Sequence, residues 1–295
     1  MLELPNCRTL LAFSGGPDSV GLAARLRGAD IVLGYADHRL RGAADVRRER
    51  ASVVAAARAL GVPLVRTRLR CGPGEAGARS ARYRALHALA RKHGCAAVAC
   101  AHTADDRAET ILLQLARGTG LRGLASPQPA CVVDGMLRVR PALDERRSAL
   151  HAAARGFPVV QDLTNRELRA ARARLRAILL PALQTLWGED PVPLLCALAD
   201  EAACMRKTLE RRAELQRPQA DRRTLLREPR PTFAYLVEAL RRAAGRCGPP
   251  LTARAYSALR EFLAAGRRGR RYRSPGGEWW WVRRGDRLEI TPLVR

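Results

Sequence analysis

The chain of 295 residues carries 53 Lys and Arg against 28 Asp and Glu, a formal net charge of +25, and 47% of its residues are hydrophobic. It is long enough to bury one large or two ordinary cores without disulfides, and it has no apolar run of the ~20 residues that cross a bilayer. The first residues carry Glu3 and Pro5 where a signal peptide needs an apolar run. The composition excludes membrane-spanning and disulfide-stapled classes, and it predicts a soluble, cytoplasmic protein with a polyanionic partner.

A drift of composition toward Arg explains part of this charge, because Lys92 and Lys207 are the lysines among the 53 basic residues. Drift explains Arg in place of Lys, but it does not explain the excess of basic over acidic residues. We therefore interpret the charge as favouring a nucleic-acid partner. The eight cysteines show no CxxC spacing, which favours reduced thiols over a zinc or cluster site.

Strands and helices alternate over the first ~125 residues, a pattern typical of a parallel sheet covered on both faces. The expected strands are 10–13, 31–35, 62–69 and 96–100, and the expected helices are 20–26, 45–60, 78–93 and 105–117. Ser14, Asp37 and His102 fall at the carboxyl ends of three of these strands. Ligands of such sheets bind at that edge, so we expect these three side chains to converge in one crevice.

The pattern changes after Pro158. The sequence predicts an Arg-rich helical stretch (165–183), a long amphipathic helix (191–215), a charged, proline-containing linker (216–231), two helices (233–242 and 253–264) and a small β-meander (270–290). We expect a catalytic domain over 1–185, a helical segment and linker over 186–231, and a small α+β domain over 232–295.

The most specific local pattern lies between the first strand and helix and reads Ser14-Gly15-Gly16-Pro17-Asp18-Ser19. Two glycines let backbone N–H groups point into one concavity, and the helix N-terminus adds positive potential for a phosphate. A carboxylate cannot bind an anion directly, so Asp18 suggests a bridging Mg²⁺. The alternative is a plain glycine turn, but the two flanking hydroxyls favour the phosphate site. The loop lacks the Lys of a Walker P-loop and the third Gly of a dinucleotide fingerprint.

A second polar group is expected on one face at the start of a helix. His102, Asp106, Glu109 and Thr110 have the spacing i, i+4, i+7 and i+8. The carboxylates could hold an ammonium group or a metal, and His102 could assist proton transfer. The alternative is a solvated, self-capping helix start in which the acids favour the helix dipole.

Two further patterns have both a structural and a functional interpretation. Arg172, Arg174 and Arg176 could form a solvated helix face, or at least one of them could contact a nucleotide or RNA. In the run 279–281 of three Trp residues, alternate side chains point to opposite sides of a strand. At least one Trp is therefore expected in a core, and an exposed one could stack on a base.

The glycine loop matches the PP-loop signature SGGxDS of the N-type ATP pyrophosphatases, which split ATP into AMP and pyrophosphate while adenylating a substrate. Further segments resemble, in order, motifs of tRNA(Ile)-lysidine synthetases. They are 37–42 (DHRLRG), 75–83 (EAGARSARY), 101–110 (AHTADDRAET), 117–124 (RGTGLRGL), 140–143 (RPAL), 162–165 (DLTN) and 172–176 (RARLR). The resemblance covers about residues 10–185, and 275–277 with 283–287 look like the small C-terminal domain of the same enzymes. The chain departs from the pattern at Asp37, Arg107 and Ala173, where the family usually has Asn, Gln and Asn.

This resemblance implies an α/β fold with a Rossmann-like parallel sheet of the PP-loop type, a helical linker and a small α+β C-terminal domain that contacts tRNA. It implies that lysine is joined to C2 of the wobble cytidine in the CAU anticodon of tRNA(Ile), through an adenylated tRNA, with release of AMP and pyrophosphate. The lysidine formed changes codon reading from AUG to AUA. A homodimer is one option for the assembly.

The residues that the resemblance implies fall into four groups. ATP would bind to Ser14, Gly15, Gly16, Pro17, Asp18 and Ser19, with Mg²⁺ near Asp18. Lysine would bind to Asp106 and Glu109. Catalysis would rest on Asp18, His102, Asp106 and Glu109. Contacts to tRNA or nucleotide would come from Arg79, Arg82, Arg172, Arg174 and Arg176.

Two alternatives stay open from the sequence. One is an ATP-dependent tRNA thiolase of the same superfamily, against which the absence of CxxC counts. The other is a non-catalytic RNA-binding protein with a degenerate nucleotide fold, against which the intact Ser14, Asp18, Asp106 and Glu109 count.

Overall fold

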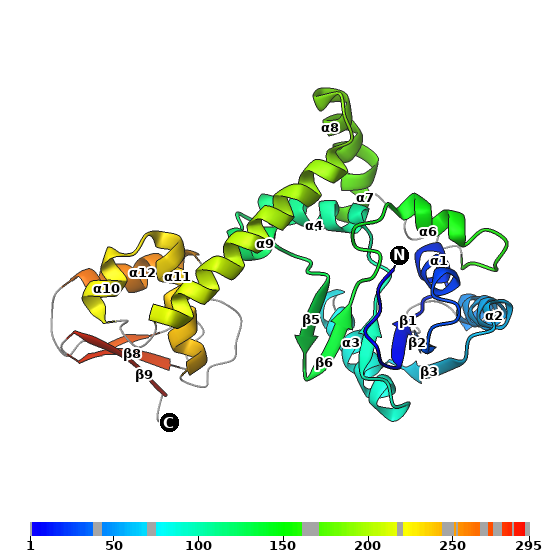
Figure 1. Cartoon of the computed structure of the whole chain (residues 1–295), viewed down its shortest axis with the longest axis horizontal. Coiled ribbons are helices and arrows are strands. Elements are labelled where there is room, and N and C mark those ends of the chain that lie inside the picture. The colour runs from blue at the N-terminus through cyan, green and yellow to red at the C-terminus, as the bar shows by residue number, and fades with distance from the viewer. Residues whose placement is uncertain are drawn as a thin grey trace. The chain divides into compact units, whose positions relative to one another are not determined.

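A computed structural model describes residues 2–37, 43–69, 75–160, 171–216, 221–243, 251, 253–265, 271–273, 279–284 and 286–292 (Figure 1). The chain forms two compact units, residues 1–201 and 202–295. The three-part division with boundaries near 185 and 231 stays a prediction.

Unit 1 is built on a six-stranded sheet of order β3-β2-β1-β4-β6-β5. The strands are β1 (Thr9–Ala12), β2 (Ile31–Asp37), β3 (Leu64–Arg68), β4 (Ala97–Ala99), β5 (Ala130–Val133) and β6 (Met136–Val139). All neighbouring pairs are parallel except β5 with β6. The mostly parallel α/β sheet expected from the sequence is confirmed, whereas the edge hairpin β5–β6 was not predicted.

Helices cover both faces of this sheet (Figure 1). Helices α1 (Pro17–Arg25), α2 (Ala43–Leu60) and α6 (Arg147–Ala153) share one hydrophobic core with Leu11 of β1. Helix α3 (Glu75–Lys92) packs in a second core with Leu10. Adjacent residues of a strand point to opposite faces, so β1 supplies both cores, and its first three residues are buried.

The remaining helices of unit 1 stand at the carboxyl edge of the sheet and beyond it. Helix α4 (Ala104–Ala116) follows β4 and packs on the first turns of α9 (Pro191–Gln216) through Ile111 and Leu195, among other residues. Helix α5 (Leu121–Leu124) is a single short turn. Helix α7 (Ala171–Arg174), a π-helical turn (Leu175–Leu179) and α8 (Leu180–Trp187) form one continuous helical stretch. Its expected beginning at 165–170 lies outside the described residues.

Unit 2 is a small α+β body with its own core, as the sequence predicted. It contains α10 (Arg222–Arg227), α11 (Arg230–Ala243), α12 (Ala253–Ala264) and the antiparallel strands β7 (Arg271–Arg273), β8 (Trp279–Arg284) and β9 (Arg287–Pro292). Trp281 is 1% exposed and packs with Phe233 and Leu259, which confirms a core role for one Trp of the run. Helix α10 lies within the stretch expected to be a linker, and Asp221 caps it by accepting from the Thr224 N–H at 2.8 Å.

No helix in the described part of the chain combines the length and the apolar character that crossing a membrane requires.

Gly21 sets the distance between α1 and α6. A Cβ atom at this position would lie 1.9 Å from the carbonyl oxygen of Leu150. Replacing Gly by Ala inside a helix ordinarily stabilises it by roughly 0.5–1 kcal/mol. Gly21→Ala should instead lower the free energy of unfolding by about 1–3 kcal/mol, because the two helices must separate.

Urea unfolding of purified Gly21→Ala measures this effect. Gly120→Ala is the matched control, since a Cβ atom there meets nothing within 4 Å. Equal midpoints for the two variants would show that α1 and α6 are not in the close contact described.

Candidate active site

The loop between β1 and α1 requires glycine at its second position. Gly15 has φ +76, a conformation that other residues rarely adopt. A Cβ atom there would lie 2.7 Å from Val160 and 2.8 Å from Val53, and the Gly15 carbonyl accepts the Val160 N–H at 2.8 Å. Contacts with Val53 and Val160 therefore hold the loop in this shape.

The hydroxyls of Ser14 and Ser19 face each other across the loop, with 3.3 Å between their Oγ atoms. Ser19 Oγ also donates to the Gly16 carbonyl at 2.9 Å, and the Gly16 N–H donates to Ser14 Oγ at 3.4 Å. Gly16 is the N-cap residue of α1, and as a glycine it has no side chain that could accept from the first N–H groups of the helix. The first N–H groups of a helix need an external acceptor, so this helix start is suited to a phosphate.

Asp18 stands in the first turn of α1, beside two groups from α6. Its carboxylate lies 2.8 Å from His151 Nε2 and 3.8 Å from Arg147 Nε. Burial raises the pKa of Asp18 above its ordinary value, although Arg147 and His151 act in the opposite direction. The side chain is 36% exposed, so a ligand on the loop can reach it.

The start of α4 is capped by its own side chains. Thr103 Oγ1 accepts the Asp106 N–H at 3.4 Å, and Asp106 Oδ2 accepts both the N–H and the hydroxyl of Thr103 at 3.0 Å. The helix start is therefore self-capping, as the alternative interpretation expected, and the cap uses one of the two carboxylate oxygens of Asp106. His102 precedes the cap and is partly exposed.

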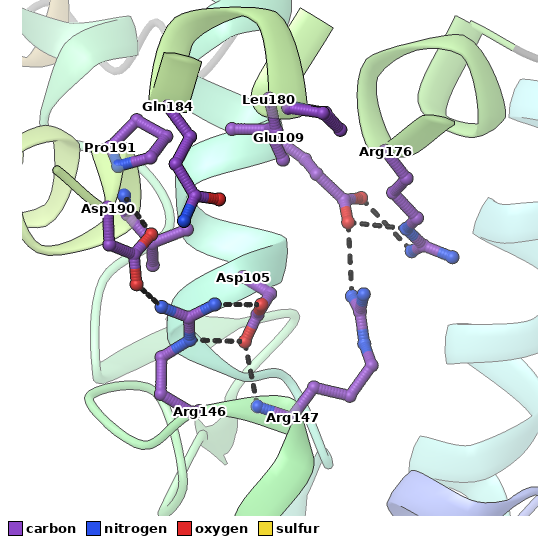
Figure 2. A pocket seen from close by; sticks show the side chains of 11 residues that line it. Asp105, Glu109, Arg146, Arg147, Arg176, Leu180, Gln184, Asp190 and Pro191 are labelled. Carbon is purple, nitrogen blue, oxygen red and sulfur yellow. Dashed lines mark hydrogen bonds and ion pairs between the residues drawn. The ribbon is translucent and has the colours of Figure 1, made fainter. Parts of the chain in front are cut away.

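The second oxygen of Asp106 and one oxygen of Glu109 accept from the Arg147 guanidinium. Its Nη2 lies 2.8 Å from Asp106 Oδ1 and 3.1 Å from Glu109 Oε1. Figure 2 shows the contact with Glu109. Burial would raise the pKa of Asp106, but Arg147, the Thr103 hydrogen bonds and nearby His102 outweigh it and hold that pKa below its ordinary value. Both carboxylates are buried, Glu109 completely, and such burial requires the cation.

Two of the three predicted arginines face α4. Arg176 forms an ion pair with Glu109, with Nη2 3.0 Å from Oε2, and Arg172 Nη2 donates to Thr110 Oγ1 at 3.3 Å. Figure 2 shows the Glu109 carboxylate between Arg147 and Arg176. Arg174 is exposed. Residues four apart share a helix face, so Arg172 and Arg176 could have been expected on the same side from the sequence.

A cavity of about 260 Å³ opens beside these ion pairs. It is lined by Asp105, Glu109, Arg146, Arg147, Arg176, Leu180, Pro181, Gln184, Asp190, Pro191 and Val192 (Figure 2). Drug-sized ligands occupy roughly 300–1,000 Å³, so this cavity suits a smaller molecule. Charges of both signs line it, which fits a polar and charged ligand.

The segment 144–147, which sequence reasoning did not single out, connects the parts of this site. Arg146 pairs with Asp105 at 3.0 Å and also with Asp190, and the Arg147 N–H donates to Asp105 at 2.7 Å. Glu145 pairs with Arg25 of α1, and its carbonyl accepts the Ala104 N–H at 2.9 Å. A run of two acids and two arginines was the available signal, but its partners lie on α1, on α4 and at Asp190, just before α9.

Arg107, one of the three residues at which the sequence departs from the motifs that it resembles, is 1% exposed and anchors the same segment. Its Nη1 lies 3.2 Å from Asp144 and 3.3 Å from Asp200 of α9, to which Nη2 also binds. A buried guanidinium requires such counter-ions.

Other predicted residues lie apart from this network. Asp37, at the end of β2, is buried and forms an ion pair with Arg50 of α2. Arg82 on α3 is exposed. His38, residues 162–165 and the side chain of Arg79 lie outside the described residues.

The residues at the loop fit a Mg²⁺ ion that is shared with phosphates. Mg²⁺ usually takes one or two carboxylates and completes its shell with waters and substrate phosphates. Asp18 offers one partly exposed carboxylate beside the loop, and the described residues contain no group of three side chains that could hold a metal by themselves.

Comparison with known proteins identifies the class. A model of the PP-loop domain matches residues 2–183, so the chain belongs to the PP-loop family. A solved structure of a U34-tRNA thiolase from Methanococcus maripaludis has the same fold, with a TM-score of 0.55 at 13% identity over 69% of this chain and 73% of that one.

Curated relatives narrow the class. The chain is 42% identical over 202 residues to a tRNA(Ile)-lysidine synthase of Bordetella parapertussis, a match that covers 63% of this chain and 58% of the relative. The corresponding protein of Streptomyces coelicolor is 41% identical over 202 residues, covering 64% and 56%. That of Methylobacterium nodulans is 42% identical over 185 residues, covering 58% and 52%. The chain thus spans little more than half the length of these relatives.

Arg107 and Asp200 should be energetically coupled. In Asp200→Asn, the buried guanidinium of Arg107 keeps the contact with Asp144 but loses the second of the two carboxylates described above. In Arg107→Gln, the shorter side chain cannot reach both Asp144 and Asp200. We expect each change to lower the free energy of unfolding by about 1–2 kcal/mol, and the double variant to lose less than their sum by about 0.5–3 kcal/mol.

A double-mutant cycle by urea unfolding measures this coupling. The partly exposed pair Arg206 and Glu210, 3.5 Å apart on α9, is the control and should show a coupling of only about 0.3–0.5 kcal/mol. Additive effects at Arg107 and Asp200 would contradict the described contact.

Proposed function

We propose that this protein joins lysine to C2 of the wobble cytidine in the CAU anticodon of tRNA(Ile), using ATP. The observation that carries the proposal is the position of Arg147 between two groups of residues. It lies 3.8 Å from Asp18, beside the loop 14–19 that we call the phosphate loop. It also lies 3.1 Å from Glu109, which with Asp106 forms what we call the acidic face of α4. The proposed nucleotide site and the proposed amine site would thus adjoin, as a reaction between an adenylated base and an amine demands. Membership of the PP-loop family and the lysidine synthase relatives support the same reaction.

In the first step, the C2 oxygen of the cytidine attacks the α-phosphorus of ATP, and the bond to the β-phosphate bridging oxygen breaks. Negative charge grows on the departing pyrophosphate. The N–H groups at the start of α1 and the hydroxyls of Ser14 and Ser19 can stabilise this charge. Bound beside Asp18, Mg²⁺ would supply further charge neutralisation.

In the second step, the ε-amine of lysine attacks C2 and AMP leaves. Asp106 and Glu109 hold the ammonium group in this proposal, and the cavity beside them receives the rest of the amino acid. The amine must lose a proton before it attacks. Asp106 or His102 can accept this proton, because both side chains lie at the start of α4, where the amine is proposed to bind.

The RNA partner is proposed from charge and exposure. The net charge of +25 favours polyphosphate, and Arg82 and Arg174 are exposed cations on unit 1. An anticodon loop is single-stranded, so its bases can be splayed into a pocket. A cytoplasmic location belongs to the same proposal, since tRNA is modified there.

The proposal is tested by incubating the protein with ATP, labelled lysine and a CAU-anticodon tRNA(Ile) transcript. We expect release of AMP and pyrophosphate and incorporation of one lysine per tRNA. A transcript with another anticodon and folded Asp18→Ala protein are the controls, and neither should give product. Transfer of sulfur to the tRNA would favour the thiolase alternative, and tRNA binding without ATP use would favour a non-catalytic protein.

Glu109→Gln should damage the second step more than the first. The change keeps the shape of the side chain but removes the charge that attracts an ammonium. We expect lysidine formation to fall by at least about tenfold while adenylated tRNA still forms, which is the signature of a lost interaction in one step.

Separate measurement of adenylated tRNA and lysidine decides the role of Glu109. Equal loss of both products would assign Glu109 to the nucleotide site. Unchanged products would assign it to the structure of α4.

A further inference from the structure

A guanidinium nitrogen of Arg147 lies where the proposed function needs the ammonium of lysine. Arg147 Nη2 is 2.8 Å from Asp106 Oδ1 and 3.1 Å from Glu109 Oε1, distances typical of charge-assisted hydrogen bonds. A lysine amine bound by these two carboxylates would occupy the same position. The protein therefore fills the proposed amine site with a cation of its own.

The acidic face would survive the departure of Arg147. Asp106 Oδ2 would keep its two bonds from Thr103, each 3.0 Å long. Glu109 would keep its ion pair with Arg176, with Nη2 3.0 Å from Oε2. A carboxylate offers about four acceptor positions, so the positions that Arg147 vacates would be open to another cation.

A bound nucleotide would attract Arg147 away from Asp106 and Glu109. Its Nε lies 3.8 Å from Asp18, in the first turn of the helix that follows the phosphate loop. A triphosphate on this loop would bring several negative charges close to the guanidinium, and Arg binds phosphate through two parallel hydrogen bonds. The side chain is 19% exposed and can turn, while the Arg147 N–H stays bonded to Asp105 at 2.7 Å.

We propose that Arg147 is an internal competitor of lysine, which leaves the acidic face when ATP binds and so makes lysine binding depend on ATP. The proposal rests on the proposed function, from which it takes the amine site. Because binding free energies are linked, lysine must tighten nucleotide binding by the same factor by which nucleotide tightens lysine binding. The site thereby withholds lysine until the nucleotide is in place.

The experiment titrates lysine into the full chain, with and without saturating α,β-methylene-ATP, which cannot be cleaved at the reacting bond. We expect the analogue to raise the affinity for lysine by at least about tenfold, within the range usual for linked sites. In Arg147→Gln, we expect lysine to bind more tightly than to the unchanged protein when nucleotide is absent. We also expect the analogue to change that affinity by less than about twofold. A gain of affinity is a result that structural damage would not produce.

Arg146→Gln is the matched control. It removes the neighbouring arginine of the same cavity, which pairs with Asp105 and Asp190 rather than with Asp106 and Glu109. The ratio of lysine affinities with and without the analogue should persist in this variant. Thermal unfolding of both variants checks that they are folded.

The proposal is overturned by a lysine affinity that is the same with and without the analogue, or undetectable in both states. A ratio that persists in folded Arg147→Gln overturns it too. The proposed function fails separately, when no lysine is incorporated into tRNA in the presence of ATP. A protein that forms lysidine but shows no coupling would keep the function and lose this inference.

Discussion

The ion pairs of Arg147 are the interaction on which the site depends. Strands β1 and β4 are adjacent and parallel, with Thr9 opposite Ala97, so the helices that follow them begin side by side. Each helix brings acids to this edge, namely Asp18 on α1 and Asp106 and Glu109 on α4. Buried carboxylates without a cation would take up protons or push the helices apart. The guanidinium of Arg147, on α6, contacts all three carboxylates and so connects the first turns of α1 and α4.

The sequence was most informative where local chemistry decides the structure. The glycine loop, the alternation of strands with helices and the acidic start of α4 could be predicted because each depends on residues close together in the chain. Arg147 could not, since its partners lie about 40 and 130 residues away and no periodicity links them. Helix α6 and strands β5 and β6, each of seven residues or fewer, are too short for periodicity to identify.

Arg107 shows how a departure from the family pattern is accommodated. A longer, charged side chain in a buried position needs carboxylates within reach, and Asp144 and Asp200 supply them from two other elements. Asp144 belongs to the same segment as Arg147. Through Asp144, Arg107 is therefore joined to the segment that carries Arg147.

The π-helical turn Leu175–Leu179 affects which side chains of the helical stretch from α7 to α8 face the site. Arg172 and Arg176 contact α4, and Leu180 and Gln184 line the cavity, so the side chains facing the site recur every four residues. In an α-helix of 3.6 residues per turn, a spacing of four drifts by about 40° at each step, and three steps would take Gln184 roughly 120° from Arg172. A π turn takes in more residues and rotates the face back. Deleting one residue within Leu175–Leu179 would bring Arg172 and Gln184 to eleven residues apart, about 20° around an α-helix, so both would still face the site. Turning this stretch into regular α-helix at unchanged length would instead carry them to different sides, even though every side chain that touches a partner had been kept.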